Sequence, residues 1–255
     1  MPFATSGFRW DLAGLIILFV GLLAGISRAQ VVEPSTAPSI TDSRFAQGEK
    51  LYSDDFDTDT GRWVSELEQG GNITFGKGKL EIDVPKGATV WFKPMLKGPV
   101  LIQYQAKVIA AGGKNDRVSD LNCFWMAKDS RNPDDLFAVK RSGKFADYNQ
   151  LLCYYVGVGG NANTTTRFRR YIGDATTRPL LAGNDLSGRE NLLTANASQW
   201  ITLVACDHLI QFYRDGKKLF EMEDPEPYTV GNFAFRTTQS QLEISQFRVY
   251  GLAPH

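Results

Sequence analysis

The chain has 255 residues, of which 43% are hydrophobic and 22% are charged, with 24 glycines and 11 prolines. These proportions are typical of a folded globular protein and exclude a disordered or collagen-like chain. The 28 basic and 28 acidic side chains give a formal net charge of zero, so no overall positive field favours nucleic acid or an anionic membrane surface. We therefore expect any preference for a charged ligand to come from a local cluster of side chains.

The first 29 residues have the pattern of a secretory signal peptide. Arg9 precedes an apolar stretch, residues 12–26, which is too short and too often interrupted by glycine for a membrane-spanning helix. The small residues Ser27 and Ala29 follow this stretch. We expect cleavage after Ala29 and a secreted or periplasmic protein with no membrane contact after cleavage. An uncleaved N-terminal anchor is the alternative. Residues 30–47 predict a linker and residues 48–255 a single domain.

Short segments rich in Val, Ile, Thr and aromatic residues dominate the chain from residue 48 onward, and turn-forming residues separate them. Such segments, with no amphipathic helical period between them, predict an all-β fold of two antiparallel sheets, a jelly-roll sandwich. The pair Asp215-Gly216 between two apolar segments predicts a type I′ hairpin turn. The predicted strand segments are residues 51–56, 71–84, 88–95, 100–110, 121–129, 151–159, 164–172, 199–206, 209–215, 217–222, 231–238 and 242–251.

Cysteine and histidine usage limits the chemistry that the chain can perform. Cys123, Cys153 and Cys206 lie beside apolar residues inside predicted strands, which favours buried thiols; a disulfide between Cys123 and Cys153 is the alternative. His208 lies in a predicted turn and His255 is the last residue, which argues against a His-based triad, a zinc site or a His general base.

We expect no cofactor, with one open question at an acidic run early in the domain. The sequence contains no Walker loop and no strand–GxGxxG–helix motif, so a nucleotide has no predicted binding site. Asp54, Asp55, Asp57 and Asp59 carry the hard oxygen ligands that a structural Ca²⁺ prefers. Solvated loop carboxylates are the alternative interpretation of this run.

Polar and aromatic residues are concentrated between residues 112 and 178, where we expect the functional site. In segment 164–172, a core position for Phe168 turns Arg167, Arg169 and Tyr171 to the opposite face of the strand, because side chains alternate along a strand. A group of arginines on one face is typical of a site that binds a carboxylate or another anion.

The same alternation separates neighbouring tyrosines in segment 151–159. Tyr154 and Tyr155 must point to opposite faces, and grouping Tyr155 with the apolar residues Leu151 and Cys153 predicts that Tyr154 lies on the open face. In segment 121–129 the polar residues Asn122 and Lys128 indicate the open face, and alternation places Phe124 and Met126 on the same face.

These assignments predict a site with a phenol, cations and an amide. Arginine and amide donors neutralise the carboxylate of a uronate sugar and stabilise the enolate that forms when its C5 proton is removed, while a tyrosine transfers protons. A solvated arginine-rich strand with ordinary strand tyrosines is the alternative. The candidate catalytic residues are Tyr154, Tyr148, Arg167, Arg169 and Asn122, and the candidate substrate-binding residues are Arg117, Asn161, Asn163, Tyr171 and Lys128.

Both ends of the domain resemble a known fold family. LYSDDFDTDTGRW, LIQFYRDGKKLF and GNFAFRTTQSQLEISQFRVYG resemble the first and last strands of concanavalin A-like lectin/glucanase domains of secreted proteins. The middle segments NDRVSDLNCFWMAKD, RSGKFADYN and YYVGVGGNANTTTRFRRY are similar to one family of these domains, which occurs in polysaccharide-degrading bacteria and has no assigned function. The resemblance spans about residues 51–250 and implies a jelly-roll sandwich with a carbohydrate site on its concave sheet.

The resemblance also narrows the reaction class. Glucanases of this fold carry an ExDxE strand motif, which the chain lacks, whereas jelly-roll uronate lyases use Tyr with Arg, Asn or Gln, similar to the candidate residues above. We therefore expect a carbohydrate-active protein that acts on an anionic glycan, namely a C–O lyase or dehydratase eliminating across a uronate. A non-catalytic carbohydrate-binding module and a glycoside hydrolase are the alternatives.

Overall fold

The computed structural model describes residues 1–4 and 36–255. Most of the predicted signal peptide and the first part of the predicted linker lie outside these residues, so the leader and its cleavage stay predictions. Within the described part of the chain, no helix is long and apolar enough to cross a membrane.

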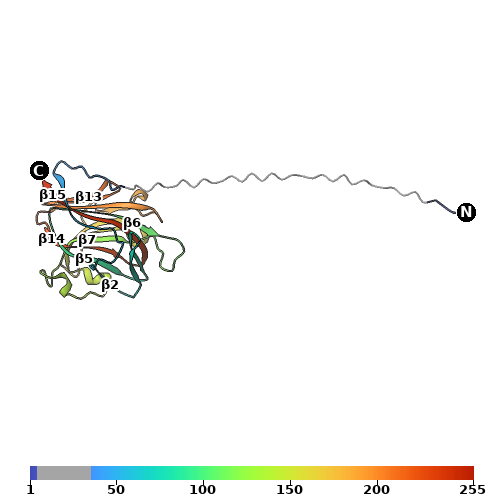
Figure 1. The fold of residues 1–255 in the computed structure, drawn as a ribbon, viewed down its shortest axis with the longest axis horizontal. Coiled ribbons are helices and arrows are strands. Elements are labelled where there is room, and N and C mark those ends of the chain that lie inside the picture. The colour runs from blue at the N-terminus through green and yellow to red at the C-terminus, as the bar shows by residue number, and fades with distance from the viewer. Residues whose placement is uncertain (5–35) are drawn as a thin grey trace. The chain divides into compact units, whose positions relative to one another are not determined.

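The domain is a sandwich of two antiparallel sheets, which confirms the predicted all-β class (Figure 1). The eight-stranded sheet has the order β13-β12-β11-β6-β15-β4-β3, with β1 paired to β15, and the seven-stranded sheet has the order β10-β9-β8-β7-β14-β5-β2. The first comprises β1 (Phe45–Asp54), β3 (Asn72–Gly76), β4 (Lys79–Val84), β6 (Val100–Ile109), β11 (Ser198–Cys206), β12 (Leu209–Arg214), β13 (Lys217–Glu223) and β15 (Ser240–Pro254). The second comprises β2 (Trp63–Leu67), β5 (Ala88–Lys97), β7 (Leu121–Asp129), β8 (Leu151–Gly159), β9 (Thr165–Ile172), β10 (Asp185–Leu186) and β14 (Val230–Thr237).

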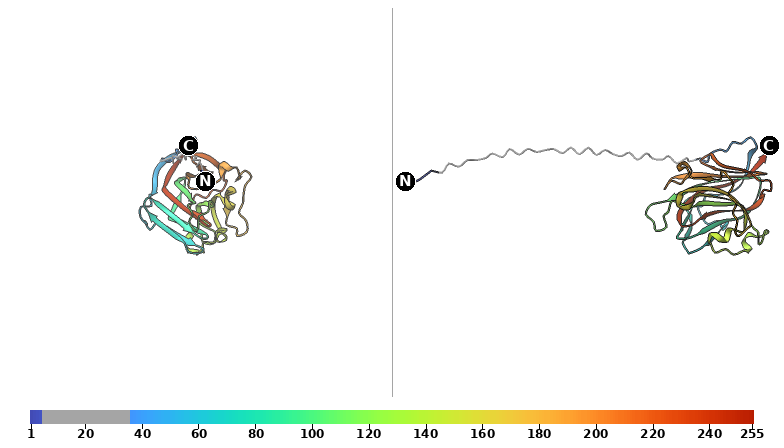
Figure 2. Two further views of the ribbon diagram at one scale, coloured as in Figure 1. Left: turned by 90° about the vertical axis from the view of Figure 1, so that its right-hand side faces the viewer. Right: turned by 180° about the vertical axis from the view of Figure 1, so that it is seen from behind.

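Helical structure in the described residues is confined to short turns. They are η1 (Leu136–Ala138), η2 (Phe145–Tyr148), α1 (Gly160–Asn163) and η3 (Arg189–Asn191). Both views in Figure 2 show the same two-layered arrangement of strands. η1 and η2 lie between β7 and β8, α1 lies between β8 and β9, and η3 follows β10.

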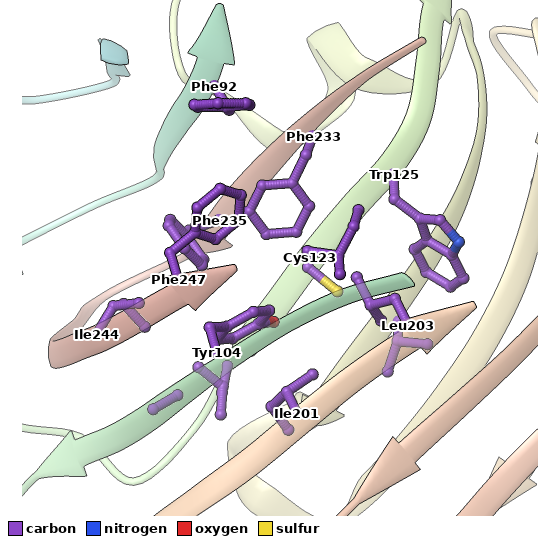
Figure 3. Packing of buried hydrophobic residues seen from close by; sticks show 14 of the residues in the cluster. Phe92, Tyr104, Cys123, Trp125, Ile201, Leu203, Phe233, Phe235, Ile244 and Phe247 are labelled. Carbon is purple, nitrogen blue, oxygen red and sulfur yellow. The ribbon is translucent and has the colours of Figure 1, made fainter. Parts of the chain in front are cut away.

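Aromatic side chains from both sheets fill the space between them (Figure 3). Phe233 and Phe235 of β14 contact each other edge to face with ring centroids 4.8 Å apart, and Phe235 meets Tyr104 of β6 at 5.0 Å. Phe247 of β15 packs against Phe92 of β5 at 5.1 Å. Each fully buried side chain of this size stabilises the fold by about 1.5–3 kcal/mol, so this aromatic layer holds the sheets together.

The hairpin between β12 and β13 has the predicted turn. Arg214 pairs with Lys217 across a two-residue loop, and the loop residues Asp215 and Gly216 have φ angles of 50° and 76°. Two consecutive positive φ angles are the requirement of a type I′ turn, which Asp-Gly meets at little cost.

The first strand begins before residue 48, the predicted start of the domain. Phe45 opens β1, pairs with Pro254 and is buried. The Arg44 guanidinium bonds both Asp42 and Glu221, which fastens this end of the chain to β13. The last residues of the predicted linker are therefore part of the sandwich.

The acidic run after β1 does not gather its carboxylates around one point. Asp54 is buried and accepts hydrogen bonds from the Phe56 amide at 2.8 Å and the Trp63 indole at 2.9 Å. Asp55 is ion-paired with Arg248. Among the described residues no cluster of three or more acidic, histidine or cysteine side chains has the arrangement of a metal site.

The three cysteines are buried and unpaired, and the alternative Cys123–Cys153 disulfide is not formed. Cys123 lies in the core between the sheets, whereas Cys153 packs in a second cluster on the outer face of the seven-stranded sheet. Burial raises the pKa of Cys123 to about 12 and that of Cys206 to about 11. The thiolate, which is the reactive form, is therefore scarce at neutral pH.

Thiol titration checks this assignment. The folded protein should react negligibly with a disulfide reagent such as DTNB at neutral pH, because all three thiols are buried and protonated. Unfolding in urea without reductant should release three reactive thiols per chain. A single reactive thiol in the unfolded chain would reveal a disulfide and contradict the structure.

Candidate functional site

A cavity of about 320 Å³ lies on the outer face of the seven-stranded sheet, over β7, β8 and β9. Its wall is polar and cationic, with four arginines and one carboxylate. The residues that line it are Arg117, Asp120, Asn122, Phe145, Tyr155, Gly157, Gly160, Asn161, Thr165, Arg167, Arg169, Arg178 and Thr238. Half of the residues predicted for the site, Arg117, Asn122, Asn161, Arg167 and Arg169, are in this group.

Tyr155, and not Tyr154, faces the cavity, so the predicted orientation of strand β8 is wrong. Tyr154 is 0% exposed and packs in the core between the sheets, with its ring centroid 5.5 Å from that of Trp125. Leu151 and Cys153 share the outer face with Tyr155 but are buried there in a second apolar cluster. Because both faces of β8 are apolar, grouping Tyr155 with these residues did not identify the inner face.

Tyr154 has a structural role in the core. Its hydroxyl donates to Asp224 Oδ2 at 2.7 Å and accepts from the Tyr228 amide at 3.0 Å, while Arg170 Nε donates to the same Asp224 oxygen at 2.7 Å. Burial and the hydrogen bond to Asp224 raise the pKa of Tyr154. A phenol held in this way has no access to a substrate in the cavity.

The hydroxyl of Tyr155 lies above Gly157 and close to Asn122. A Cβ atom on residue 157 would lie 2.5 Å from the Tyr155 hydroxyl oxygen and 3.1 Å from Asn122 Oδ1, so a larger residue at this position would displace the two polar groups. Asn122 Oδ1 is buried with no hydrogen-bond partner among the described residues. Burial raises the pKa of Tyr155 well above its usual range, so the hydroxyl keeps its proton at neutral pH.

The four arginines differ in how their charge is balanced. Arg167 forms a two-pronged pair with Asp185 at 2.9 Å, and Arg117 is ion-paired with Asp120 at 3.0 Å. Arg169 and Arg178 have no carboxylate partner within residues 36–255.

In the described part of the chain, neither of these two arginines has a carboxylate in direct contact; the charge of Asp185 reaches Arg169, but Asp185 is ion-paired with Arg167. Arg169 Nη1 donates to the Arg178 carbonyl, and the Arg178 guanidinium lies 5.0 Å from the centre of the Phe145 ring. Burial and the nearby charges of Arg178 and Arg167 lower the pKa of Arg169. Two nearby cations that have no ion-paired carboxylate of their own form a site that favours an anion.

The rim of the cavity is a left-handed turn after β8. Asn161 and Asn163 have φ angles of 53° and 61°, a conformation that asparagine tolerates better than most residues. Asn161 lines the cavity. Asn163 instead exchanges two hydrogen bonds with the backbone of Leu193, of 2.9 and 3.0 Å, which fixes the turn to the loop after η3.

The other predicted residues lie away from the cavity, for identifiable reasons. Tyr148 is 0% exposed and donates to Glu66 Oε2 at 2.7 Å, and Tyr171 is equally buried on the same face of the sheet. Lys128 follows an irregularity in β7, where Met126 has a φ of 52° and the register with β8 shifts. The shift turns Met126 into the core and interrupts the alternation that linked Lys128 to Asn122.

The cavity also contains four charged or aromatic groups that are not among the predicted site residues. Tyr155 was excluded by the orientation assigned to β8, although the alternative orientation was available. Asp120 and Arg178 lie in the polar region expected to hold the site, but in loops, where alternation gives no orientation, and Phe145 comes from a segment whose position depends on tertiary packing.

Substitution of the two neighbouring tyrosines distinguishes their roles by stability. Tyr154→Phe should lower the free energy of unfolding by about 1–3 kcal/mol, because Asp224 and the Tyr228 amide each lose a buried partner. Tyr155→Phe should change it little, since its hydroxyl has no hydrogen-bond partner in the described structure. Urea unfolding monitored by tryptophan fluorescence measures both, and equal losses would contradict the assignment.

Comparisons with known proteins agree with the fold. A family model described as a domain of unknown function (DUF6250) matches residues 82–247, and no curated protein matches the chain. Among solved structures, a protein of unknown function with a galectin-like fold from Bacillus subtilis is 17% identical with a TM-score of 0.65, covering 83% of this chain and 100% of that one.

Two enzymes of the same sandwich architecture are also similar in structure. An endo-β-1,3-glucanase from Pyrococcus furiosus has 10% identity and a TM-score of 0.56, covering 84% of this chain and 100% of that one. β-Agarase B from Zobellia galactanivorans has 10% identity and a TM-score of 0.53, covering 86% and 98%. At these identities the likeness confirms the expected concanavalin A-like fold.

Proposed function

The chain belongs to the family described as a domain of unknown function (DUF6250), and we propose that this member binds an acidic saccharide in the cavity over β7, β8 and β9. The observation that carries the proposal is the pair Arg169 and Arg178, two cations without a carboxylate partner in the described structure, beside the unpartnered amide oxygen of Asn122. A sugar carboxylate supplies the missing negative charge, and sugar hydroxyls donate to the amide oxygen.

The remaining lining residues suit a sugar ring. Phe145 and Tyr155 provide aromatic surface, with ring centroids 5.8 Å apart, and Asn161, Thr165 and Thr238 add hydrogen-bonding groups around it. Saccharide binding is also consistent with the structural neighbours: an inactivated mutant of β-agarase B, 10% identical with a TM-score of 0.54, was solved in complex with agaro-octaose. With the predicted signal peptide, the proposed ligand is a glycan met outside the cytoplasm.

We further propose that the site catalyses elimination across a bound uronate. The C5 proton passes to a base, the C4–O bond breaks as the C4=C5 double bond forms, and the leaving oxygen takes up a proton, so the reaction involves no net oxidation. Tyr155 carries a proton at neutral pH and is the proton donor to the leaving oxygen. Asp120 is the acceptor, and the arginines stabilise the charge that develops on the carboxylate.

The alternative functions differ in what they require of the cavity. Glycoside hydrolysis uses two carboxyl groups on opposite sides of the scissile bond. Asp120 is the one carboxylate among the described residues that line the cavity, and it is paired with Arg117. A non-catalytic binding module needs only the arginine pair and the aromatic wall, and it is distinguished from the lyase by the absence of product.

Substitution of an unpaired arginine tests the binding proposal. Arg169→Gln should weaken binding of a uronate oligosaccharide roughly tenfold or more, because a charged hydrogen bond contributes about 1.5–3 kcal/mol. Binding of the same oligosaccharide after reduction of its carboxylates to alcohols should be weak in both proteins. Isothermal titration calorimetry measures the affinity of each protein for the charged and the reduced oligosaccharide. The matched control is Arg62→Gln, because Arg62 is exposed. Equal affinity of the wild type for the charged and reduced forms would contradict the proposal.

Substitution of Tyr155 tests the elimination step. Tyr155→Phe should lower turnover by about 10²–10⁴-fold while leaving affinity within a few-fold, since it removes one proton-transferring hydroxyl and no charge. Tyr154→Phe, corrected for its lower stability, should keep its activity. The measurement is ultraviolet absorbance of the new double bond, with mass spectrometry for substrates that are already unsaturated. Binding by wild type without any product would favour the non-catalytic module.

A further inference from the structure

The middle of the outer face of the seven-stranded sheet is covered by the protein itself. Trp91 of β5 and Phe124 of β7 point away from the core between the sheets, yet both are 0% exposed. Tyr148 stacks on Phe124 with ring centroids 5.5 Å apart and planes inclined by 20°, and Leu136 packs in the same cluster. Tyr148 and Leu136 belong to residues 132–149, which form most of the connection between β7 and β8. We call residues 132–149 the covering segment.

Buried charges hold the covering segment in place. Arg141 has a fully buried side chain that is ion-paired with Glu66 at 2.9 Å and Asp129 at 3.1 Å. Arg236 of β14 is 0% exposed and donates from beneath the segment to the Gly143 carbonyl at 2.6 Å. Opening the segment would break these pairs and uncover apolar rings, so the cover is a fixed part of the fold.

The cover also makes one wall of the cavity. Phe145 belongs to the covering segment, lines the cavity and packs against Tyr155. Along the strands, the next residues on this face of β8 and β9 are Cys153 and Tyr171, and both are 0% exposed. Across the strands, the neighbour of Tyr155 is Phe124, which is also covered. A glycan chain over Tyr155 therefore meets Phe145 and the covered part of the face, and it cannot continue in either of these directions. The cavity volume of about 320 Å³ is near the lower end of the range for ligand pockets, roughly 300–1,000 Å³.

We infer that the site takes the end of an acidic glycan, one or two sugar units, and not an internal stretch of the chain. The inference rests on the proposed function and adds the class of substrate: short uronate oligosaccharides, or the terminal unit of a polymer. The pair Arg169 and Arg178 binds the carboxylate of that unit, and the Phe145 wall stops the chain.

Binding stoichiometry as a function of chain length tests the inference. Polygalacturonate, alginate and hyaluronan are each offered as intact polymer and as fractions of defined length from partial acid hydrolysis, and bound protein is measured by sedimentation or calorimetry. For a glycan that binds, the number of proteins per chain should stay constant while the chain is shortened many-fold, so that binding per unit mass rises with the number of chain ends. Protein per chain that rises in proportion to length would overturn the inference while leaving acidic saccharide binding intact.

The proposed function fails in a different way. If none of the three glycans binds at any length, or if the carboxyl-reduced fractions bind equally well, acidic saccharide recognition is wrong and chain-end binding falls with it. The two failures are separate because the first depends on chain length and the second on charge.

A substitution in the wall identifies the barrier. Phe145→Ala should weaken binding of the terminal unit and keep the number of proteins per chain unchanged, because it removes one ring of the wall while Tyr148 and Leu136 still cover Phe124 and Trp91. Phe137→Ala is the matched control, since Phe137 lies in the same segment, is 36% exposed and does not line the cavity. Several proteins per long chain in a folded Phe145→Ala protein would overturn the assignment of the covering segment as the barrier. The wild-type series decides the inference if this variant does not fold.

Discussion

The central strands β7, β8 and β14 of the seven-stranded sheet are buried on both faces over most of their length, and this constraint limits which part of the sheet is open to solvent. One face meets the eight-stranded sheet through the aromatic core, and the other lies beneath the covering segment, where Trp91 and Phe124 are fully enclosed. Antiparallel sheets of a sandwich commonly expose one face to water. Here the part of β7, β8 and β9 beyond Phe145 is open, and the cavity forms there.

Burial on both faces also explains which orientations the sequence could predict. In β9, Phe168 is apolar and its neighbours Arg167 and Arg169 are charged, so alternation has one solution and the structure agrees with it. In β8, Tyr154 and Tyr155 belong to two sets that are both apolar, because each set packs in its own cluster. Alternation then shows that the tyrosines point apart but contains no information about which face is inner.

Features that depend on local chemistry were predictable, and features that depend on distant contacts were not. The turn at Asp215 and Gly216 follows from the conformational freedom of two residues, and it forms as expected. The position of Tyr148 depends on Glu66, which lies 82 residues earlier in the sequence. The register shift at Met126 has no sequence signature, since neither glycine nor proline marks it. Arg117 and Asn161 both line the cavity, and they lie outside the strands, so their meeting depends on how the loops pack.

The electrostatics of the cavity link ligand binding to stability. Arg169 and Arg178 repel each other at the edge of a buried region, which is an unfavourable arrangement that the unfolded chain does not have. Arg167 and Arg117 avoid this penalty through Asp185 and Asp120. A bound carboxylate would relieve this repulsion in the folded state alone. A ligand that binds only the folded state raises the free energy of unfolding, and above Kd this increase grows with the logarithm of the ligand concentration. The repulsion between these two arginines is therefore a physical reason for the proposal that the cavity binds an anion.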